Sequence, residues 1–361
     1  MKSFWVRFVF MFAFYQPSAA WAQKGVHSDS LVSVGMVMDS QEAERTFNAG
    51  LLQFQEKDFQ GAKATFSLAL RYKPLFENAL LNRAFVCMEL KEYALAQSDF
   101  TAVLNLNPSL EAAELGLAQA LANQKKFNEA LEIFSKLKQR GMPDHLPYYE
   151  SGMCFFSLGE YDKALQEFTH AVELKPDFAF GWNDLASTKR MEKDFEGAKQ
   201  GYLKAIEVDP RFAIAWANLG SVLRIIHDYA GAIEAYTKAL SFDPKNFLTL
   251  NNRGTALLEL GILERAEQDF KAATRINPQY ALALANLGVA RFKGKDYNGS
   301  IDASSRAIQL DPLLANAYLN RGVAKEAIND FSAACKDWTI AAKLGSEKAN
   351  GYMMECTASE P

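Results

Sequence analysis

The sequence has few of the residues that mark specialised protein classes. Its 361 residues include 11 prolines and 21 glycines, too few for collagen or a proline-rich linker protein. Its four cysteines are too few for a disulfide-framed miniprotein and include no Cys-x-x-Cys pair, so a cysteine-ligated zinc site is not expected. The 39 basic and 43 acidic residues nearly balance, which excludes a strongly basic nucleic-acid-binding protein and an acidic disordered tail.

The N-terminal apolar run is too short to cross a membrane. Residues 8–15 cover about 12 Å as a helix, against about 30 Å for a bilayer core. The run follows two basic residues, ends before Pro17 and precedes the small-x-small sequence at 20–22. We therefore expect residues 1–22 to be a cleaved signal peptide and the mature protein, without a spanning segment, to be exported. The expected location is periplasmic or secreted, with the bacterial cell envelope preferred; an uncleaved anchor or a buried N-terminal helix is the alternative.

Residues 23–42 separate the expected signal peptide from the rest of the chain. They show no helical periodicity. We expect a linker over residues 23–42, with a short strand at residues 31–38.

Beyond this linker, prolines recur at a fixed interval. They are Pro74, Pro108, Pro176, Pro210, Pro244, Pro278 and Pro312. The interval is 34 residues, with one member missing where Met142 precedes Pro143. Such a period marks a repeat array and overrides the two domains that length alone suggests. Numbering 34 slots from Ala43 divides the chain into nine units.

Each unit has the same pattern of small and aromatic side chains. Slot 8 is always Gly or Ala, slot 20 is Ala in all units but one, and slot 24 is aromatic in all units but one. Slots 4, 8 and 11 lie on one face of a first helix, and slots 20, 24 and 27 lie on one face of a second helix. We expect two antiparallel helices per unit, close together at the small residues, with the slot-32 proline ending the second helix.

This pattern resembles the tetratricopeptide repeat. One unit shows it most fully, with Trp216, Leu219, Gly220, Leu223, Ala232, Tyr236, Ala239 and Pro244. The resemblance implies an all-α solenoid, a right-handed superhelix whose first helices line a concave groove. It implies nine repeats over residues 43–346 and, because the ends of such arrays need caps, a capping helix and tail over residues 347–361. In the eighth unit, Ser300 and Ser304 replace the usual residues at slots 20 and 24, so weaker packing is expected there.

Comparison of the units with one another predicts three ion pairs. Slot 7 is arginine and slot 23 is aspartate in the same three units, as Arg83 with Asp99, Arg253 with Asp269, and Arg321 with Asp337. The two slots lie on the two helices of one hairpin, so a bridge across the hairpin is expected. Ligand binding by the arginines is the alternative, which the matched aspartates disfavour.

Slot 6 predicts a binding surface. It points about 160° away from slot 8, which faces the core. It carries an asparagine in six units, namely Asn48, Asn82, Asn218, Asn252, Asn286 and Asn320. An amide side chain both donates and accepts hydrogen bonds, so a row of them can hold an extended peptide backbone. The segments 217–220 and 285–288 resemble the asparagine ladder in the repeat domain of O-linked N-acetylglucosamine transferase. A solvated polar face is the alternative.

The fourth unit departs from this row. Tyr149, Met153 and Phe156 occupy neighbouring slots on its first helix. They form either an apolar sub-site of the groove or stray core residues.

Several functions lack support in the sequence. Phe47 and Leu51 replace the lysine and asparagine of a carboxylate clamp, so binding of chaperone C-terminal peptides is not expected. The four histidines are scattered, and no phosphate loop, His-Glu-x-x-His or Gly-x-Ser-x-Gly motif occurs. We therefore expect no enzymatic activity, no metal and no cofactor. Cys87 and Cys154 fall on inward faces of first helices, where buried packing is expected.

Two classes of function remain. The first is a non-catalytic scaffold that binds a partner protein or extended peptide in the concave groove. The second is a structural component of a cell-envelope assembly, such as secretion, pilus or polysaccharide-export machinery. A third, an accessory subunit of an envelope enzyme, has no sequence support. No nucleic-acid partner is expected, and no oligomeric state is predicted.

The last two cysteines predict a staple at the C-terminus. Cys335 lies in the second helix of the ninth unit, and Cys356 follows 21 residues later in the cap. Export implies an oxidising compartment, and the segment 334–338 with a later cysteine resembles the ends of many exported bacterial tetratricopeptide proteins. We expect a disulfide between Cys335 and Cys356, with Cα atoms within about 7 Å. Two free cysteines are the alternative.

Overall fold

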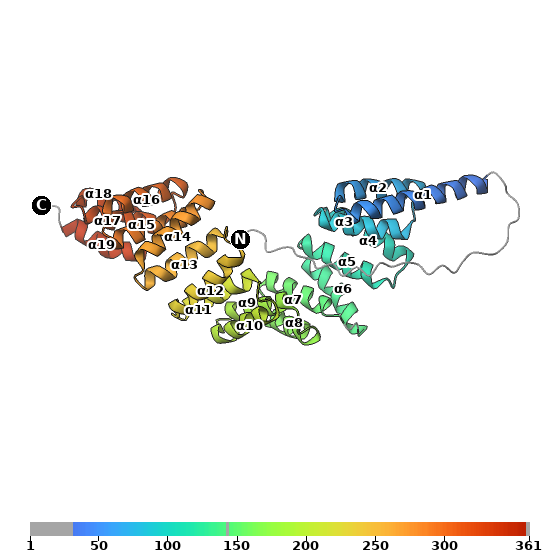
Figure 1. Cartoon of the computed structure of the whole chain (residues 1–361), viewed down its shortest axis with the longest axis horizontal. Helices are drawn as coiled ribbons and strands as arrows, with labels where there is room; N and C mark the ends of the chain where they lie inside the picture. The colour runs from blue at the N-terminus through green and yellow to red at the C-terminus, as the bar shows by residue number, and fades with distance from the viewer. Residues whose placement is uncertain (1–31, 142–143, 359–361) are drawn as a thin grey trace. The chain divides into compact units, whose positions relative to one another are not determined.

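The computed structural model describes residues 32–141 and 144–358, which fold into helices joined by short turns (Figure 1). Within these ranges every regular element is a helix and there is no strand. The expected signal peptide, residues 1–22, lies outside the described residues, as do residues 23–31 of the linker and residues Met142 and Pro143.

The helices fall into two sets. The odd-numbered helices are α1 (Val32–Gln55), α3 (Glu77–Glu89), α5 (Glu111–Asn123), α7 (Leu146–Leu158), α9 (Ala179–Met191), α11 (Ala213–Ile225), α13 (Phe247–Glu259), α15 (Ala281–Lys293), α17 (Ala315–Glu326) and the final α19 (Glu347–Ala358). The even-numbered helices are α2 (Phe59–Tyr72), α4 (Tyr93–Leu106), α6 (Phe127–Gln139), α8 (Tyr161–Leu174), α10 (Phe195–Val208), α12 (Tyr229–Phe242), α14 (Leu263–Ile276), α16 (Tyr297–Leu310) and α18 (Phe331–Lys343). Every even-numbered helix begins at slot 17 of the register set by the prolines.

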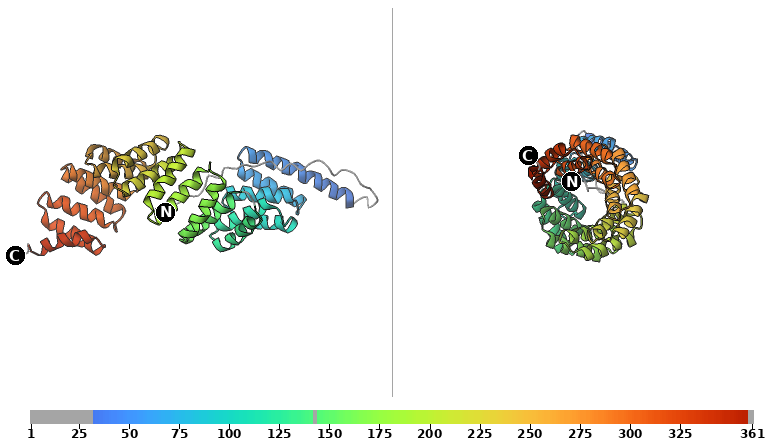
Figure 2. Two further views of the ribbon diagram at one scale, coloured as in Figure 1. Left: turned by 90° about the horizontal axis from the view of Figure 1, so that it is seen from below. Right: turned by 90° about the vertical axis from the view of Figure 1, so that its left-hand side faces the viewer.

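Helices pack in chain order within two compact bodies. The N-terminal body extends to Lys91 and the C-terminal body begins at Glu92. In the N-terminal body α1 packs on α2 and α2 packs on α3. In the C-terminal body each helix from α4 to α19 packs on the next, and the order is visible in Figure 2 from green to red. Such serial packing of helix pairs is an α-solenoid, as the sequence predicted.

First helices in the C-terminal body also contact one another. Contacts join α5 to α7, α9 to α11, α11 to α13, α13 to α15, and α15 to α17. The odd-numbered helices therefore share a surface that runs from repeat to repeat, and the slot-6 residues belong to these helices.

Small residues at slot 8 hold the two helices of a pair close together. A Cβ atom on Gly220 would lie 2.7 Å from the ring of Tyr236, and one on Gly152 would lie 2.7 Å from the ring of Phe168. Both rings are fully buried. The aromatic residue at slot 24 therefore fills the space that the missing side chain leaves, as the pattern predicted.

The eighth unit keeps its helices close but changes the polarity of its core. Ser300 and Ser304 are fully buried, and neither hydroxyl has a hydrogen-bond partner among the described residues. A Cβ atom on Gly288 would still lie 2.6 Å from Oγ of Ser304. The two serines therefore leave two unsatisfied hydroxyl groups in the core without separating the helices. Each buried unsatisfied group costs about 1–3 kcal/mol of stability.

Helix α1 corrects part of the linker prediction. It begins at Val32, so residues 32–42 are helical, and the short strand expected at 31–38 is wrong. A strand is stable only when it pairs with other strands, and the described residues offer none. The core begins within this helix, where Ala43 and Phe47 are buried.

Candidate functional site

Two of the three predicted ion pairs are present, both in the C-terminal body. Nε and Nη2 of Arg253 lie 2.7 Å from the two carboxylate oxygens of Asp269. Arg321 contacts Asp337 in the same bidentate way, at 2.8 and 2.6 Å, and Nζ of Lys325 lies 2.8 Å from the same carboxylate. Both aspartates are buried. Such forked contacts satisfy the guanidinium and carboxylate together.

The third pair stays a prediction. Arg83 belongs to the N-terminal body and Asp99 to the C-terminal body, and each body is described by itself. Within its own body, Nη1 of Arg83 donates to the hydroxyl of Ser67 at 3.0 Å.

The other two arginines of the set make an equivalent contact with the preceding unit. Nη1 of Arg253 donates to Thr237 at 3.1 Å, and Nη1 of Arg321 donates to Ser305 at 3.2 Å. A hydroxyl at slot 25 was the sequence signal for this contact, and it was not recognised. These arginines tie neighbouring units together, which agrees with a structural role and not with the alternative of ligand binding.

The row of slot-6 asparagines is not uniform. Nδ2 of Asn218 donates to Oδ1 of Asn183 at 2.9 Å, and Nδ2 of Asn286 donates to Oδ1 of Asn251 at 2.9 Å. Asn183 and Asn251 are buried at slot 5 of the preceding unit. These two amides are therefore partly used within the protein.

Asn252 and Asn320 differ from them. Both are half-buried, and neither amide has a hydrogen-bond partner in the described part of the chain. The preceding units carry Ala217 and Ala285 at slot 5, where an asparagine would be needed to bond to them. Their amides are therefore available to a ligand.

The two asparagines of the N-terminal body differ again. Asn48 is exposed in α1. Nδ2 of Asn82 donates to the carbonyl of Asn78 in its own helix at 2.8 Å. Neither is therefore joined to a slot-5 asparagine of a preceding unit, as Asn218 is joined to Asn183.

Apolar side chains flank the asparagine row. Ile214, Leu248 and Leu282 lie one helical turn before Asn218, Asn252 and Asn286, and they are 37%, 50% and 39% exposed. One face of α11, α13 and α15 therefore presents an amide and an exposed aliphatic side chain in each unit.

Two carboxyl groups interrupt the row at slot 6. Oδ2 of Asp184 accepts from the hydroxyl of Tyr149 at 2.7 Å, and Oδ1 accepts from Nδ2 of Asn183 at 2.9 Å. Oε1 of Glu150 accepts from Nε2 of Gln119 at 3.1 Å. Burial raises the pKa of Glu150 to about 7 and that of Asp184 to about 6, against the opposing effect of these hydrogen bonds.

The apolar sub-site considered for the fourth unit is part of the core. Tyr149, Met153 and Phe156 are half-buried and pack on a cluster that contains Phe168. The ring of Tyr149 lies edge-on to Phe178, 4.8 Å away between centroids. The three residues are therefore stray core residues and not a sub-site, because Tyr149 already contacts neighbouring rings and donates its hydroxyl to Asp184.

The cysteines fall into two kinds. Cys87 and Cys154 are buried and belong to no disulfide. Burial raises the pKa of Cys154 to about 12, so little reactive thiolate forms there at neutral pH. Cys335 and Cys356 are joined by a disulfide with Cα atoms 5.8 Å apart. Beside it, Tyr352 of α19 stacks on Trp338 of α18, with ring centroids 4.7 Å apart.

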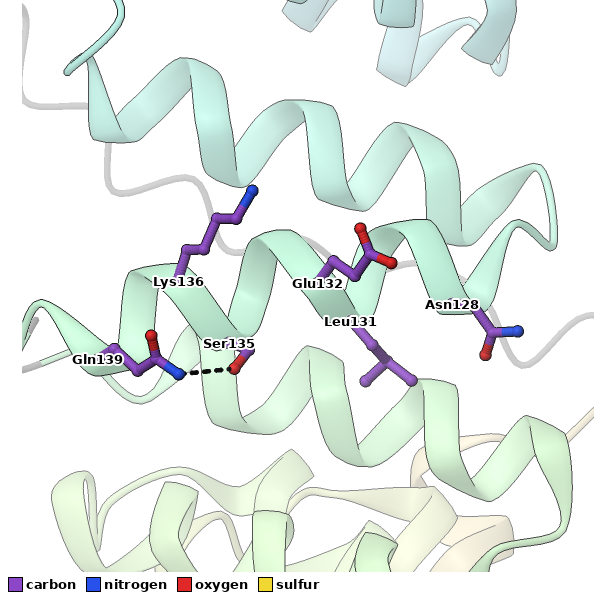
Figure 3. Close-up of a pocket in the computed structure, with 6 residues that line it drawn as sticks. All are labelled: Asn128, Leu131, Glu132, Ser135, Lys136 and Gln139. Atoms are coloured by element: carbon purple, nitrogen blue, oxygen red, sulfur yellow. Dashed lines mark hydrogen bonds between the residues drawn. The ribbon is translucent and has the colours of Figure 1, made fainter.

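Other candidate sites are weak. A surface depression is lined by Asn128, Leu131, Glu132, Ser135, Lys136 and Gln139 (Figure 3). All six side chains come from α6, so polar groups do not converge from different elements, as they do in a ligand pocket. In the described ranges no group of three His, Cys, Asp or Glu side chains is placed to hold a metal ion, and no helix is long and apolar enough to cross a membrane.

Comparison with known proteins identifies the family. Four family models described as tetratricopeptide repeat match residues 88–145, 147–178, 213–246 and 235–268. The chain is a tetratricopeptide repeat protein. Repeats of this family make it a scaffold for protein–protein interaction, a class that is typically non-catalytic. No curated protein sequence matches the chain.

Two solved structures, with TM-scores above 0.5, support the solenoid fold of this tetratricopeptide repeat protein. The Cut9–Hcn1 hetero-tetramer of the APC/C is 15% identical with a TM-score of 0.54, and the match covers 87% of this chain and 76% of that one. The pilF protein of Pseudomonas aeruginosa is 19% identical with a TM-score of 0.52, covering 60% and 97%. A shorter match, to MamA, is 25% identical with a TM-score of 0.43 and covers 48% and 94%.

Proposed function

We propose that this tetratricopeptide repeat protein holds an extended segment of a partner protein along the surface shared by α11, α13, α15 and α17. The observation that carries the proposal is the pair of half-buried amides on Asn252 and Asn320 that have no partner among the described residues. The amide atoms of neither residue are among the buried atoms that lack a partner, so both amides are accessible to a ligand. A peptide backbone supplies both a donor and an acceptor to such an amide.

The neighbouring residues fit the same ligand. Asn218 and Asn286 can each also bind a ligand, because only one N–H of each amide is used within the described chain and the second N–H and the carbonyl oxygen remain. The exposed Ile214, Leu248 and Leu282 can contact apolar side chains of the bound segment. In this proposal the amides bind the backbone and the aliphatic residues favour a segment that carries apolar side chains.

We propose that this binding takes place after export, in the periplasm or outside the cell. The N-terminal segment with its basic start, apolar run and small-x-small sequence supports this location. So does the disulfide between Cys335 and Cys356, because such bonds persist in oxidising compartments. Cell fractionation with N-terminal sequencing tests it; a full-length protein in the cytoplasm would contradict it.

The binding surface is tested by crosslinking in intact cells, affinity capture and mass spectrometry. The variant Asn252→Ala with Asn320→Ala should lose its partners, at a cost of about 0.5–1.5 kcal/mol of binding free energy per hydrogen bond. Its melting temperature should be nearly unchanged, because neither amide is bonded within the described chain.

The matched control is Asn128→Ala with Asn298→Ala, which removes two exposed amides from the start of second helices. This control should retain the partners. Full capture by the Asn252 and Asn320 variant would place the contacts elsewhere, and a structural role in an envelope assembly would then replace the groove-binding role.

A further inference from the structure

Two consecutive units share a set of polar residues that no other unit has. The set combines serine at slot 9, arginine at slot 12 and tyrosine at slot 24. Its members are Ser187, Arg190 and Tyr202 in the fifth unit, and Ser221, Arg224 and Tyr236 in the sixth unit. Because the set recurs as a whole, its members are expected to lie together.

The structure brings each set together between a first and a second helix. The hydroxyls of Ser187 and Tyr202 are 3.0 Å apart, and the hydroxyl of Tyr236 donates to Ser221 at 3.2 Å. Burial raises the pKa of both tyrosines, while the contact with serine, a hydrogen bond with the arginine of the same unit and nearby positive charge act in the opposite direction. For Tyr236 that charge comes from Arg224 and Arg190 together, so both guanidinium groups lie near one hydroxyl.

Neither arginine has an acidic partner within the ranges that the structure describes. Arg190 and Arg224 are half-buried, and Nε of each is buried there without a hydrogen-bond acceptor. They contrast with Arg253, which is paired in a bidentate contact with Asp269. The carboxylate of Asp184 is close enough to Tyr202 to influence it, but Tyr149 and Asn183 already donate to that carboxylate.

Partly buried positive charges are costly unless an anion compensates them. Guanidinium groups bind carboxylates through two parallel hydrogen bonds in one plane. An arginine side chain that turns toward a bound carboxylate would therefore also give its Nε a hydrogen-bond acceptor. The two units therefore offer a pair of positive charges for which the described part of the chain provides no counter-charge.

We propose that Arg190 and Arg224 bind two acidic side chains of the extended partner segment. This inference rests on the proposed function and specifies the chemistry of the ligand at the fifth and sixth units. Neighbouring first helices pack about 8–10 Å apart. An extended peptide in the polyproline II conformation rises about 3.1 Å per residue and has three residues per turn, so acidic residues three positions apart lie on one side at a matching distance.

The probe is a short fluorescein-labelled peptide of Gly and Ser with two glutamates at that spacing, and its partner probe has two glutamines instead. Fluorescence anisotropy measures binding to the full chain at low and physiological salt. The glutamate peptide should bind, and more weakly at higher salt, because ions screen the charges. The glutamine peptide should bind at least about tenfold more weakly.

The test variant is Arg190→Gln with Arg224→Gln, which should weaken binding of the glutamate peptide by about tenfold or more. The matched control is Lys204→Gln with Lys238→Gln, which removes two charges from exposed positions on the second helices of the same units. Arg190→Lys with Arg224→Lys keeps the charge without the planar fork and should retain part of the affinity. Circular dichroism melting of each variant establishes that it is folded.

Three results would overturn the inference: no binding of the glutamate peptide by the wild-type chain, equal binding of the glutamate and glutamine peptides, or equal loss in the arginine and lysine variants. Capture of partners in cells separates this inference from the proposed function. If the Asn252 and Asn320 variant loses its partners but the arginine variant keeps them, the groove function stands and the acidic ligand is wrong.

Discussion

At the scale of single residues, arginine has two environments in this protein. Arg253 and Arg321 are held by bidentate contacts to buried aspartates, whereas Arg190 and Arg224 have no acidic partner among the described residues. The first kind could be predicted from the sequence, because the aspartates occur in the same units as the arginines. The second kind could not, because the significance of these arginines depends on which neighbours are absent.

The ion pair of Arg321 gives the first stability prediction. Asp337→Ala leaves Arg321 and Lys325 facing each other without the carboxylate, and should lower the free energy of unfolding by about 3 kcal/mol. Arg321→Met and Lys325→Met combined with Asp337→Leu should cost much less, because no charge of this cluster is left unpaired. Urea denaturation followed by circular dichroism measures both. Equal losses in the two variants would show that packing, and not charge, holds this site together.

The buried acids predict a dependence of stability on pH. In the folded state the pKa values of Glu150 and Asp184 are raised to about 7 and about 6, so between about pH 4 and pH 7 the folded chain binds more protons than the unfolded chain. These two groups therefore make folding less favourable as pH rises through that window.

Glu150→Gln removes about half of this effect. It should raise the free energy of unfolding at pH 8 by about 3 kcal/mol, and the gain should shrink toward pH 4. The exposed control, Glu234→Gln, should show no such trend in urea denaturation. A gain that is the same at both pH values would mean that ionisation of Glu150 is not its source.

At the scale of helices and turns, the pattern of small, aromatic and proline residues was sufficient to place most elements. It predicted two helices per unit and a helix in the cap, where α19 is found. It missed the contacts between Asn183 and Asn218 and between Asn251 and Asn286. Those contacts join slot 5 of one unit to slot 6 of the next. A comparison of the same slot in different units does not reveal a pair whose two members occupy different slots. It also missed the helical start of α1, whose extension depends on no repeat signal.

The turn inside each helix pair requires a left-handed residue at slot 15. Lys193 has φ of 65° there, and Gly159 has φ of 78°. Because a side chain makes this conformation unfavourable by about 1–2 kcal/mol, Lys193→Gly should stabilise the protein by up to about 1 kcal/mol and Gly159→Ala should destabilise it by a similar amount. A Cβ atom on Gly159 would meet no atom within 4 Å, so no steric clash with a neighbouring residue contributes to the second effect. Thermal melting measures both, and shifts of the same sign would refute the argument.

The disulfide affects the last helix most. Helix α19 has no following helix to pack on among the described residues, and Cys356 ties it to Cys335 in α18. Replacing both cysteines by serine should lower stability by about 3 kcal/mol in the chain-entropy model and should speed hydrogen exchange in α19 before other helices. Wild-type protein in reductant should behave like the variant. Unchanged exchange in α19 would show that stacking of Tyr352 on Trp338 is sufficient to hold the cap.

At the scale of the whole molecule, most of the architecture follows from one 34-residue pattern. Serial packing of α4 to α19 means that each helix is stabilised chiefly by its neighbours in the chain. The sequence therefore predicted the fold class well, since a repeated local pattern specifies the same local packing each time. The partner surface was harder to predict, because it depends on the residues in which the units differ.

The contacts between neighbouring units also fix the order of the units. Tyr149 bonds to Asp184, Asn183 to Asn218, and Asn251 to Asn286, each time across a distance of 35 residues in the chain. If the fifth and sixth units exchanged places, Tyr149 would face an asparagine and Asp184 would face an alanine. The helices would still fit, but the polar partners would not. The units share one fold and yet are not interchangeable. A chain in which the two units are exchanged is therefore expected to keep the helical fold and lose part of its stability.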